Sequence, residues 1–270
     1  MKKILTRSLS GIVYIAIILG SILFGQPYFA LFVVLLSILG ALEFTKITQG
    51  LSKDRTYMIS IDVLTTIFVA SAGICLHSIY VALGLYLIRF IATLYSQQEN
   101  PLRSLSYSML TISYIGLPLF LMSKIYEMES GALFILAMFV LIWINDTGAF
   151  VVGCSIGKHR LFERVSPKKS WEGFFGGLLF NIIAAVLFFY FGSTETAILK
   201  NLPFCIGFAI VVTIFATWGD LVESLIKRTL HLKDSGNMIP GHGGILDRID
   251  SLLLVAPAIY LFLFIFTKLI

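Results

Sequence analysis

The residues best suited to chemistry form one polar stretch, from Ser224 to Asp250, between two apolar runs that are each long enough to cross a bilayer. This stretch is rich in lysine, arginine, aspartate and glycine. Cations neutralise phosphate oxygens, glycines let backbone N–H groups point at an anion, and carboxylates bind divalent metal ions. Such a mixture beside a membrane predicts a site for phosphate groups and metal ions.

Polar side chains at the end of the preceding apolar run share one face of the expected helix. At about 100° per residue, an arc of roughly 140° contains Asp220, Glu223, Ser224, Lys227 and Arg228. Ionisable residues in a span are costly and usually face a cavity or a partner. The alternative is structural, with Asp220 and Glu223 only neutralising Lys227 on the same face. The residues alone leave both interpretations open.

Two further acids, Asp247 and Asp250, stand one helical turn apart at the start of the last apolar run. Acids at a helix N-terminus also stabilise the helix dipole, which would explain one of them without a ligand. Adjacent spans run in opposite directions, so we expect both acids to lie near Asp220 and Glu223. Asp146 should reach the same level from another span. Gathered carboxylates predict a bound divalent cation, Mg2+, as one ion or a pair.

Between the two acidic helices, residues 240–244 form a glycine-rich turn whose backbone N–H groups can face an anion. Lys233 and Arg248 flank this turn. A glycine cluster is equally typical of a simple re-entry turn. His242 could donate to a phosphate, cap the turn or only pack, while Gly243 and Gly244 would let the backbone approach the anion.

A second basic loop precedes another expected helix. Its candidate phosphate contacts are Lys158, Ser166, Lys168, Lys169 and Ser170. Ser170 is a suitable N-cap, and the positive N-terminal end of a helix is a natural seat for phosphate. The same lysines could instead only obey the positive-inside rule or touch anionic lipid.

Membrane helices must position all these residues. The chain has 58% hydrophobic and 13% charged residues and a mean hydropathy of +0.93. This composition excludes an ordinary soluble domain. A span needs about 20 mostly apolar residues, so we expect an all-α, polytopic integral membrane protein with about nine transmembrane helices. The expected spans are 9–24, 28–45, 57–76, 79–95, 105–122, 131–150, 173–191, 202–224 and 251–267.

The basic residues fall almost wholly on alternate inter-span segments, and the other segments contain only Lys124, Lys200 and Lys268. By the positive-inside rule this places the N-terminus in the cytoplasm and the C-terminus outside. A thin break at His77 would allow eight spans, but merging there would put the later basic loops on the wrong side. We therefore expect the protein to lie in the inner membrane, with the acids and the basic loops on its cytoplasmic side.

The polar residues are distributed unequally along the chain. Residues 1–130 carry few and scattered ones, as expected for about five N-terminal spans. Residues 131–270 hold most acids, histidines and glycines, and we expect them to form the catalytic half. Three cysteines without regular spacing support neither a disulfide framework nor a zinc site.

Two stretches, 143–173 and 224–250, closely resemble the phosphatidate cytidylyltransferases, also called CDP-diglyceride synthetases. The second contains Ser-x-x-Lys-Arg, Lys-Asp, His-Gly-Gly and Asp-Arg-x-Asp in order, so the match is very specific. Ser170 stands where the family commonly has threonine. The early spans match only in general hydrophobicity.

The resemblance implies that CTP and phosphatidate give CDP-diacylglycerol and pyrophosphate. It implies that Asp220, Asp247 and Asp250 hold Mg2+, with Asp146 and Glu223 close by. The implied phosphate contacts are Lys168, Lys169, Lys227, Arg228, Lys233 and Arg248. CTP and the lipid would be the partners, no nucleic acid is expected, and a homodimer is left open.

Two other functions compete. A CTP-dependent polyprenol or lipid kinase would use a similar setting but transfer the γ-phosphate. An ion-coupled transporter would use Asp146, Asp220 and Asp247 as a relay, although such acids usually lie near the midplane. The roles of Glu43, Asp62 and Arg89 stay open among structural pairing, a dimer contact and a lipid-headgroup site.

Overall fold

The structure, a computed structural model, describes residues 2–49, 56–191, 201–236 and 243–269. It divides into two compact units. The first unit consists of Met1–Met128 and Leu230–Ile249, and the second of Glu129–Thr229 and Asp250–Ile270. The polar segment Leu230–Ile249 therefore groups with the N-terminal helices, an association that no sequence pattern indicates.

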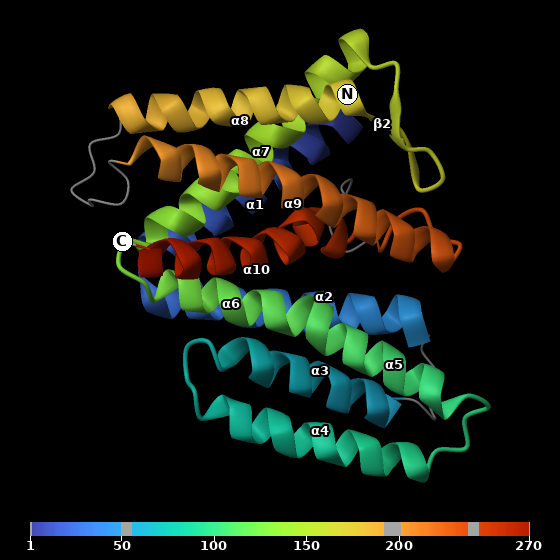
Figure 1. The fold of residues 1–270 in the computed structure, drawn as a ribbon. Coiled ribbons are helices and arrows are strands. Elements are labelled where there is room, and N and C mark those ends of the chain that lie inside the picture. Colours follow the sequence, from blue (N-terminus) through green and yellow to red (C-terminus); the bar gives the residue numbers. More distant parts are fainter. Residues whose placement is uncertain (1, 50–55, 192–200, 237–242, 270) are drawn as a thin grey trace. The chain divides into compact units, whose positions relative to one another are not determined.

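The first unit is a bundle of apolar helices in which α3 packs against α2, α4 and α6 (Figure 1). Its elements are α1 (Lys2–Leu23), α2 (Gln26–Gln49), α3 (Thr56–Ser71), α4 (Ser78–Leu94), α5 (Pro101–Thr111), the π-helical turn η2 (Ile112–Gly116) and α6 (Leu117–Tyr126). The expected single span at 105–122 is thus one continuous rod built from α5, η2 and α6.

The capped start of this continuous helix and its π-helical turn both have a local cause in the sequence. Asn100 caps its start, because its Oδ1 accepts a hydrogen bond from Arg103 N at 3.0 Å. Pro118, the second residue after η2, has no backbone N–H to donate, and its ring crowds the carbonyl of Tyr114. The π turn absorbs this conflict without breaking the helix.

The second unit contains α7 (Gly131–Ile156), β1 (Arg160–Phe162), β2 (Ser166–Ser170), α8 (Trp171–Phe191), α9 (Leu202–Thr229) and most of α10 (Leu246–Leu269). Helix α7 packs along α8, and α8 also packs along α9 (Figure 1). Strands β1 and β2 pair antiparallel. The protein is otherwise built from helices, as expected for an all-α fold. The hairpin shows in addition that the basic loop before α8 is partly extended, and its pairing holds it against the start of that helix.

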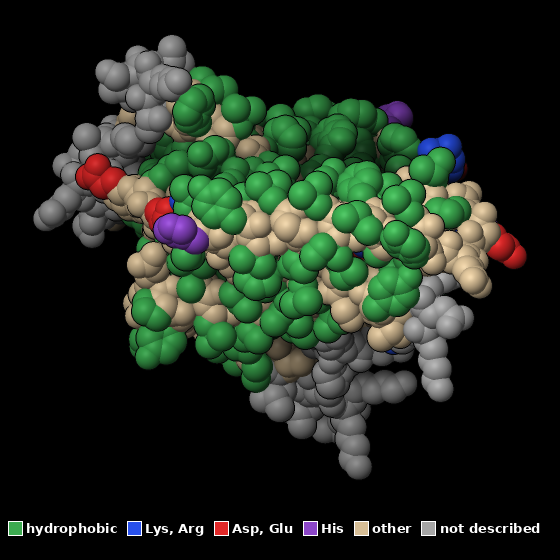
Figure 2. Space-filling view, turned by 90° about the horizontal axis from the view of Figure 1, so that it is seen from below, with side chains coloured by type: hydrophobic (Ala, Val, Ile, Leu, Met, Phe, Trp, Pro, Cys, Tyr) green, Lys and Arg blue, Asp and Glu red, His purple; other side chains and the backbone are tan. Residues whose placement is uncertain are grey.

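Six helices of the described part are long and apolar enough to cross a membrane, and α1, α3 and α4 contribute shorter apolar segments. Large hydrophobic side chains point outward along these helices, for example Leu83, Leu87 and Ile91 on one face of α4. Figure 2 shows a face covered largely by such side chains, with charged groups near its two ends. These surfaces indicate an integral membrane protein, whereas the nine spans and the orientation of the termini stay predictions.

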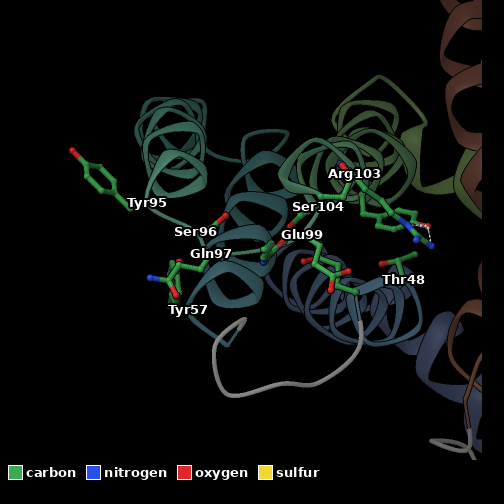
Figure 3. A pocket seen from close by; sticks show the side chains of 12 residues that line it. Thr48, Tyr57, Tyr95, Ser96, Gln97, Glu99, Arg103 and Ser104 are labelled. Atoms are coloured by element: carbon green, nitrogen blue, oxygen red, sulfur yellow. Dashed lines mark hydrogen bonds between the residues drawn. The ribbon is translucent and has the colours of Figure 1, made fainter.

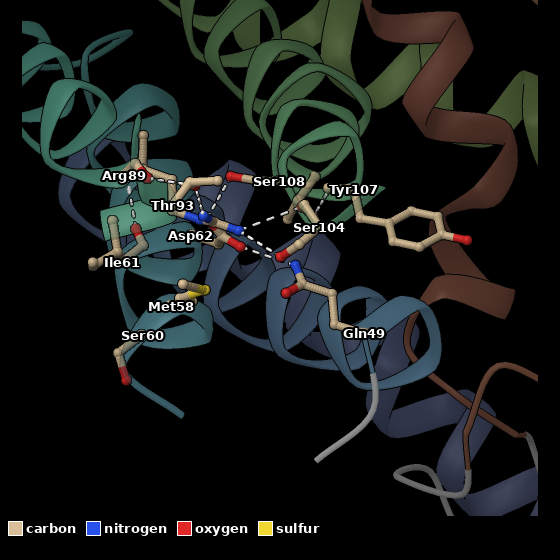
Figure 4. A network of polar contacts seen from close by, with 12 residues as sticks. Gln49, Met58, Ser60, Ile61, Asp62, Arg89, Thr93, Ser104, Tyr107 and Ser108 are labelled. Carbon is tan, nitrogen blue, oxygen red and sulfur yellow. Dashed lines mark hydrogen bonds and ion pairs between the residues drawn. The ribbon is translucent and has the colours of Figure 1, made fainter. Parts of the chain in front are cut away.

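The open question about Asp62 and Arg89 is answered by their contact. Arg89 Nε lies 2.8 Å from Asp62 Oδ1, with both side chains almost fully buried. Figure 4 shows hydroxyl and amide groups completing the network: Gln49 Nε2 donates to Asp62 Oδ2 at 2.9 Å, and Arg89 Nη2 donates to Ser104 Oγ at 2.9 Å. Ser108 Oγ also donates to Asp62. The charges therefore form a structural pair that joins α2, α3, α4 and α5.

A polar pocket of about 970 Å³ lies at one end of this network. Gln49 and Ser104 belong to both, and Tyr57, Arg103 and Tyr107 contribute to the lining (Figure 3). The network thus fixes part of the pocket wall.

Candidate functional site

The basic hairpin reaches an acid of α9. Lys169 Nζ, at the end of β2, lies 2.6 Å from Asp220 Oδ2 and also donates to the carbonyl of Thr217 at 3.4 Å. Both members of the ion pair are partly exposed. The structure therefore joins two residues that the sequence proposes independently, one as a phosphate contact and one as an acid of the metal site.

The hairpin is fixed to α8 by capping and by hydrogen bonds of His159. Ser170 Oγ accepts a hydrogen bond from Gly173 N at 3.1 Å, which confirms Ser170 as the N-cap. Glu172 lies 2.6 Å from His159 Nδ1, and the backbone N–H of Trp171 donates to the carbonyl of His159 at 2.9 Å. The lysines of β2 thus have a defined position at the positive end of a helix.

Helices α9 and α10 approach closely beside Asp220. A Cβ added to Gly219 would lie 2.8 Å from the carbonyl oxygen of Asp250 and 2.9 Å from Ser251 Cα. Ser251 Oγ donates to the carbonyl of Ala216 at 3.1 Å. Because Gly219 has no side chain, the backbones can meet there, and Asp220 and Asp250 are brought to the same level.

Four carboxylates gather around this contact. Asp220, Glu223 and Asp146 all lie close enough to Asp250 to interact with its carboxylate. Glu223 Oε2 lies 2.7 Å from Lys227 Nζ. Of the two acids that the structural alternative paired with Lys227, Glu223 therefore does form this pair. Asp220 instead pairs with Lys169 and accepts a hydrogen bond from Ser224 Oγ at 3.3 Å.

The third predicted metal ligand, Asp247, stands in the first turn of α10 and supports the preceding segment. Its Oδ2 accepts hydrogen bonds from Gly244 N at 3.0 Å, Ser235 Oγ at 2.9 Å and Ser235 N at 3.2 Å. The same segment contacts Glu43 of α2 through Ser235, Ile245 and Leu246. Sequence reasoning did not assign Glu43 or Ser235. An acid within an apolar span is a signal that could have pointed to Glu43. No feature of the sequence pointed to Ser235.

The remaining candidates are distributed over both units. The exposed ones are Asp146, Lys158, Lys168, Arg228, Lys233 and Arg248, while Ser166 is half-buried. Gly243 has a positive φ of 84°, as expected for a glycine turn, and Gly244 is buried. His242 lies outside the described residues. Asp146 therefore stays a predicted acid beside the metal site, and the other residues stay predicted substrate contacts.

The fit of Mg2+ can be judged from the donor set. In the described part of the chain, no group of three or more His, Cys, Asp or Glu side chains is arranged to hold a metal ion as it stands. The carboxylates that act on Asp250 nevertheless offer only oxygen donors, the type that Mg2+ prefers. A cluster of oxygen donors suits a divalent cation, so the residues fit Mg2+ in their chemistry.

Comparisons with known proteins show the family of this chain. The cytidylyltransferase family matches residues 5–266. A phosphatidate cytidylyltransferase of Staphylococcus epidermidis is 33% identical over 262 residues, covering 95% of this chain and 98% of that protein. One from Staphylococcus haemolyticus is 30% identical over 95% of this chain and 98% of its own. One from Staphylococcus aureus is 36% identical over 63% of this chain and 64% of its own.

These matches extend over the early helices, which carry no motif of their own. They confirm the resemblance seen in the two polar stretches and identify the protein as an enzyme of the nucleotidyltransferase type. The chain belongs to the cytidylyltransferase family.

Proposed function

We propose that this protein transfers the cytidylyl group of CTP to phosphatidate, giving CDP-diacylglycerol and pyrophosphate. Relatives named phosphatidate cytidylyltransferase match nearly its whole length. The observation that carries the proposal is the 2.6 Å ion pair between Lys169 and Asp220. It joins a basic hairpin at a helix N-terminus to a group of carboxylates, which is the pairing of charges that a nucleoside triphosphate and a metal ion require.

The lipid phosphate is the nucleophile. The second pKa of a phosphate monoester is about 6, so this group is largely dianionic at pH 7. One of its oxygens attacks the α-phosphorus of CTP in line. The new P–O bond forms while the bond from the α-phosphorus to the bridging oxygen of the β-phosphate breaks, and that oxygen leaves with pyrophosphate. No proton has to be removed, so the protein supplies positioning and charge neutralisation.

Six cations would bind the phosphate oxygens. They are Lys168, Lys169, Lys227, Arg228, Lys233 and Arg248. The N-terminal end of α8, capped by Ser170, would add backbone N–H groups and a favourable dipole. Together these groups would neutralise the charge on the leaving pyrophosphate.

Asp220 and Asp250, with Asp247 one turn earlier on α10, would hold Mg2+, which when bound neutralises phosphate oxygens. The remaining work falls to the protein's own residues. Lys169 would orient Asp220, and Lys227 would hold Glu223 in place. We place the site at the cytoplasmic face of the inner membrane, because CTP is soluble and the lipid keeps its acyl chains in the bilayer.

The test is to incubate the detergent-purified protein with phosphatidate, Mg2+ and CTP labelled at either the α- or the γ-phosphorus. The expected result is α label in the lipid together with released pyrophosphate. Label from the γ position in the lipid would identify a kinase instead. Absence of labelled lipid with both nucleotides would contradict either transferase and favour a transporter.

A further inference from the structure

A carboxylate of the N-terminal helices holds the polar segment that leads into α10. Glu43 is only 4% exposed. Its Oε1 accepts hydrogen bonds from Ser235 Oγ at 2.5 Å and from Leu246 N at 3.1 Å. Its Oε2 accepts one from Ile245 N at 3.0 Å. A single side chain from α2 therefore binds both ends of the segment Ser235–Leu246.

The position of Glu43 suits its charge. Ile245 and Leu246 provide backbone N–H groups at the start of α10, where the first N–H groups of a helix lack partners within the helix. A carboxylate there satisfies two of these donors and interacts favourably with the positive end of the helix dipole. Asp62, in contrast, binds the buried Arg89. Glu43 and Asp62, both buried acids of the first unit, thus have different roles.

Gly236 and Gly244 leave room for this carboxylate. A Cβ on Gly244 would overlap Glu43 Oε1 and Ser235 Oγ, and a Cβ on Gly236 would lie 2.8 Å from Glu43 Oε2. Side chains at these two positions would push the segment away from α2. The close approach of backbone to carboxylate therefore explains why glycine stands at both.

The contact continues from Glu43 to Asp247. Ser235 Oγ lies 2.5 Å from Glu43 Oε1 and 2.9 Å from Asp247 Oδ2, so its hydroxyl is shared between the two carboxylates. Gly244 N and Ser235 N also donate to Asp247 Oδ2. Groups that orient a metal-binding or catalytic side chain from behind can change metal affinity or activity about 10- to 100-fold.

We propose that Glu43 is a positioning residue, which acts through Ser235 and the start of α10 to hold the Asp247 carboxylate in the geometry needed for catalysis. Only the effect on catalysis rests on the proposed function. The positioning of Asp247 by Glu43 is a property of the fold. Glutamine at position 43 cannot reproduce the arrangement. Its single carbonyl oxygen cannot accept from three donors, and its amide N–H would face one of them.

The first experiment measures backbone hydrogen exchange, resolved to single amides, in Glu43→Gln and wild-type protein. Ile245 and Leu246 report on the contact with Glu43, whereas Gly244 and Ser235 donate to Asp247 and report on its position. We expect all four amides to exchange faster in Glu43→Gln. Unchanged exchange at Gly244 and Ser235 would overturn the proposal, since Asp247 would then be held without Glu43.

Ser235→Ala separates the two steps. It removes the shared hydroxyl but keeps the bonds from Ile245 and Leu246 to Glu43. We expect faster exchange at Gly244 with continued protection at Leu246. Equal loss of protection at both amides would mean general loosening of the segment and would contradict transmission through Ser235.

Activity tests the last step. In Glu43→Gln we expect a roughly 10- to 100-fold lower kcat and a higher Mg2+ concentration for the half-maximal rate. The matched control is Asp62→Asn, which removes another buried carboxylate of the first unit. If Asp62→Asn, at equal loss of thermal stability, shifted the Mg2+ dependence equally, the effect would be one of stability and the proposal would fail.

The outcomes for the two proposals are distinguishable. A wild-type protein that forms no CDP-lipid would refute the proposed function, while the exchange pattern would still decide whether Glu43 positions Asp247. An active wild type with faster exchange but unchanged kcat and Mg2+ dependence in Glu43→Gln would refute the catalytic step of the positioning proposal alone.

Discussion

Lys169 Nζ lies 2.6 Å from Asp220 Oδ2, and this contact joins the basic hairpin to α9. The lysine is held from one side by the capped start of α8, since Ser170 follows it directly. A lysine in this position can orient the carboxylate in the resting enzyme and turn to a phosphate oxygen when substrate arrives. The pair is partly exposed, so its role is geometric more than stabilising.

Asp220→Asn should reduce kcat by about 100-fold or more, because it removes a charge that the phosphate and metal site needs while keeping the size of the side chain. The measurement is the rate of CDP-lipid formation at saturating CTP and Mg2+. Melting in detergent should change little, since Asp220 is partly exposed. Activity close to that of the wild type would remove Asp220 from the metal site.

Lys169→Gln should lower the rate about 10-fold or more and weaken CTP use, because a cation near the phosphates is lost. Steady-state kinetics at varied CTP concentration provide the measurement. Lys124→Gln is the matched control, as Lys124 also forms a 2.8 Å ion pair but with Glu127 at the surface. Equal effects of the two substitutions would show that a general loss of positive charge, and not the position of Lys169, is responsible.

Asp62→Asn should destabilise the protein by about 3–5 kcal/mol, because it leaves the buried guanidinium of Arg89 without its counter-charge. Thermal or denaturant unfolding in detergent would measure this loss. Glu127→Gln serves as the control for an exposed pair and should cost less than about 1 kcal/mol. A comparable stability of the two variants would contradict a structural role for the Asp62–Arg89 pair.

Gly219→Ala should separate α9 from α10, since its Cβ would lie 2.8 Å from a backbone oxygen that cannot move alone. We expect a loss of about 1–3 kcal/mol in stability and a lower rate, because Asp220 is adjacent. The control is Gly84→Ala in α4, where no atom lies within 4 Å of the added Cβ. There alanine should be neutral or slightly stabilising. Unaltered activity in Gly219→Ala would argue against a tight requirement for this helix contact.

Much of the fold follows from local patterns. The apolar runs anticipate where the helices lie, although several helix ends differ from the expected ones; for example, the expected run 131–150 is the first part of α7, Gly131–Ile156. Apolar length and the preference of Ser170 for an N-cap are properties of short segments, so they can be read without a structure. The hairpin at Arg160–Ser170 was missed, because a strand pair this short has no apolar alternation.

The order of residues alone is enough to predict a helical membrane protein with a site for phosphate groups, because composition and motif spacing need no tertiary structure. Tertiary structure alone decided which charges meet. Asp220 pairs with Lys169 and not with Lys227, and Asp62 pairs with Arg89. Glu43 meets Ser235 and Leu246 across about 200 positions of the chain. Such contacts depend on helix packing at glycines and on the satisfaction of buried donors, which no local pattern encodes.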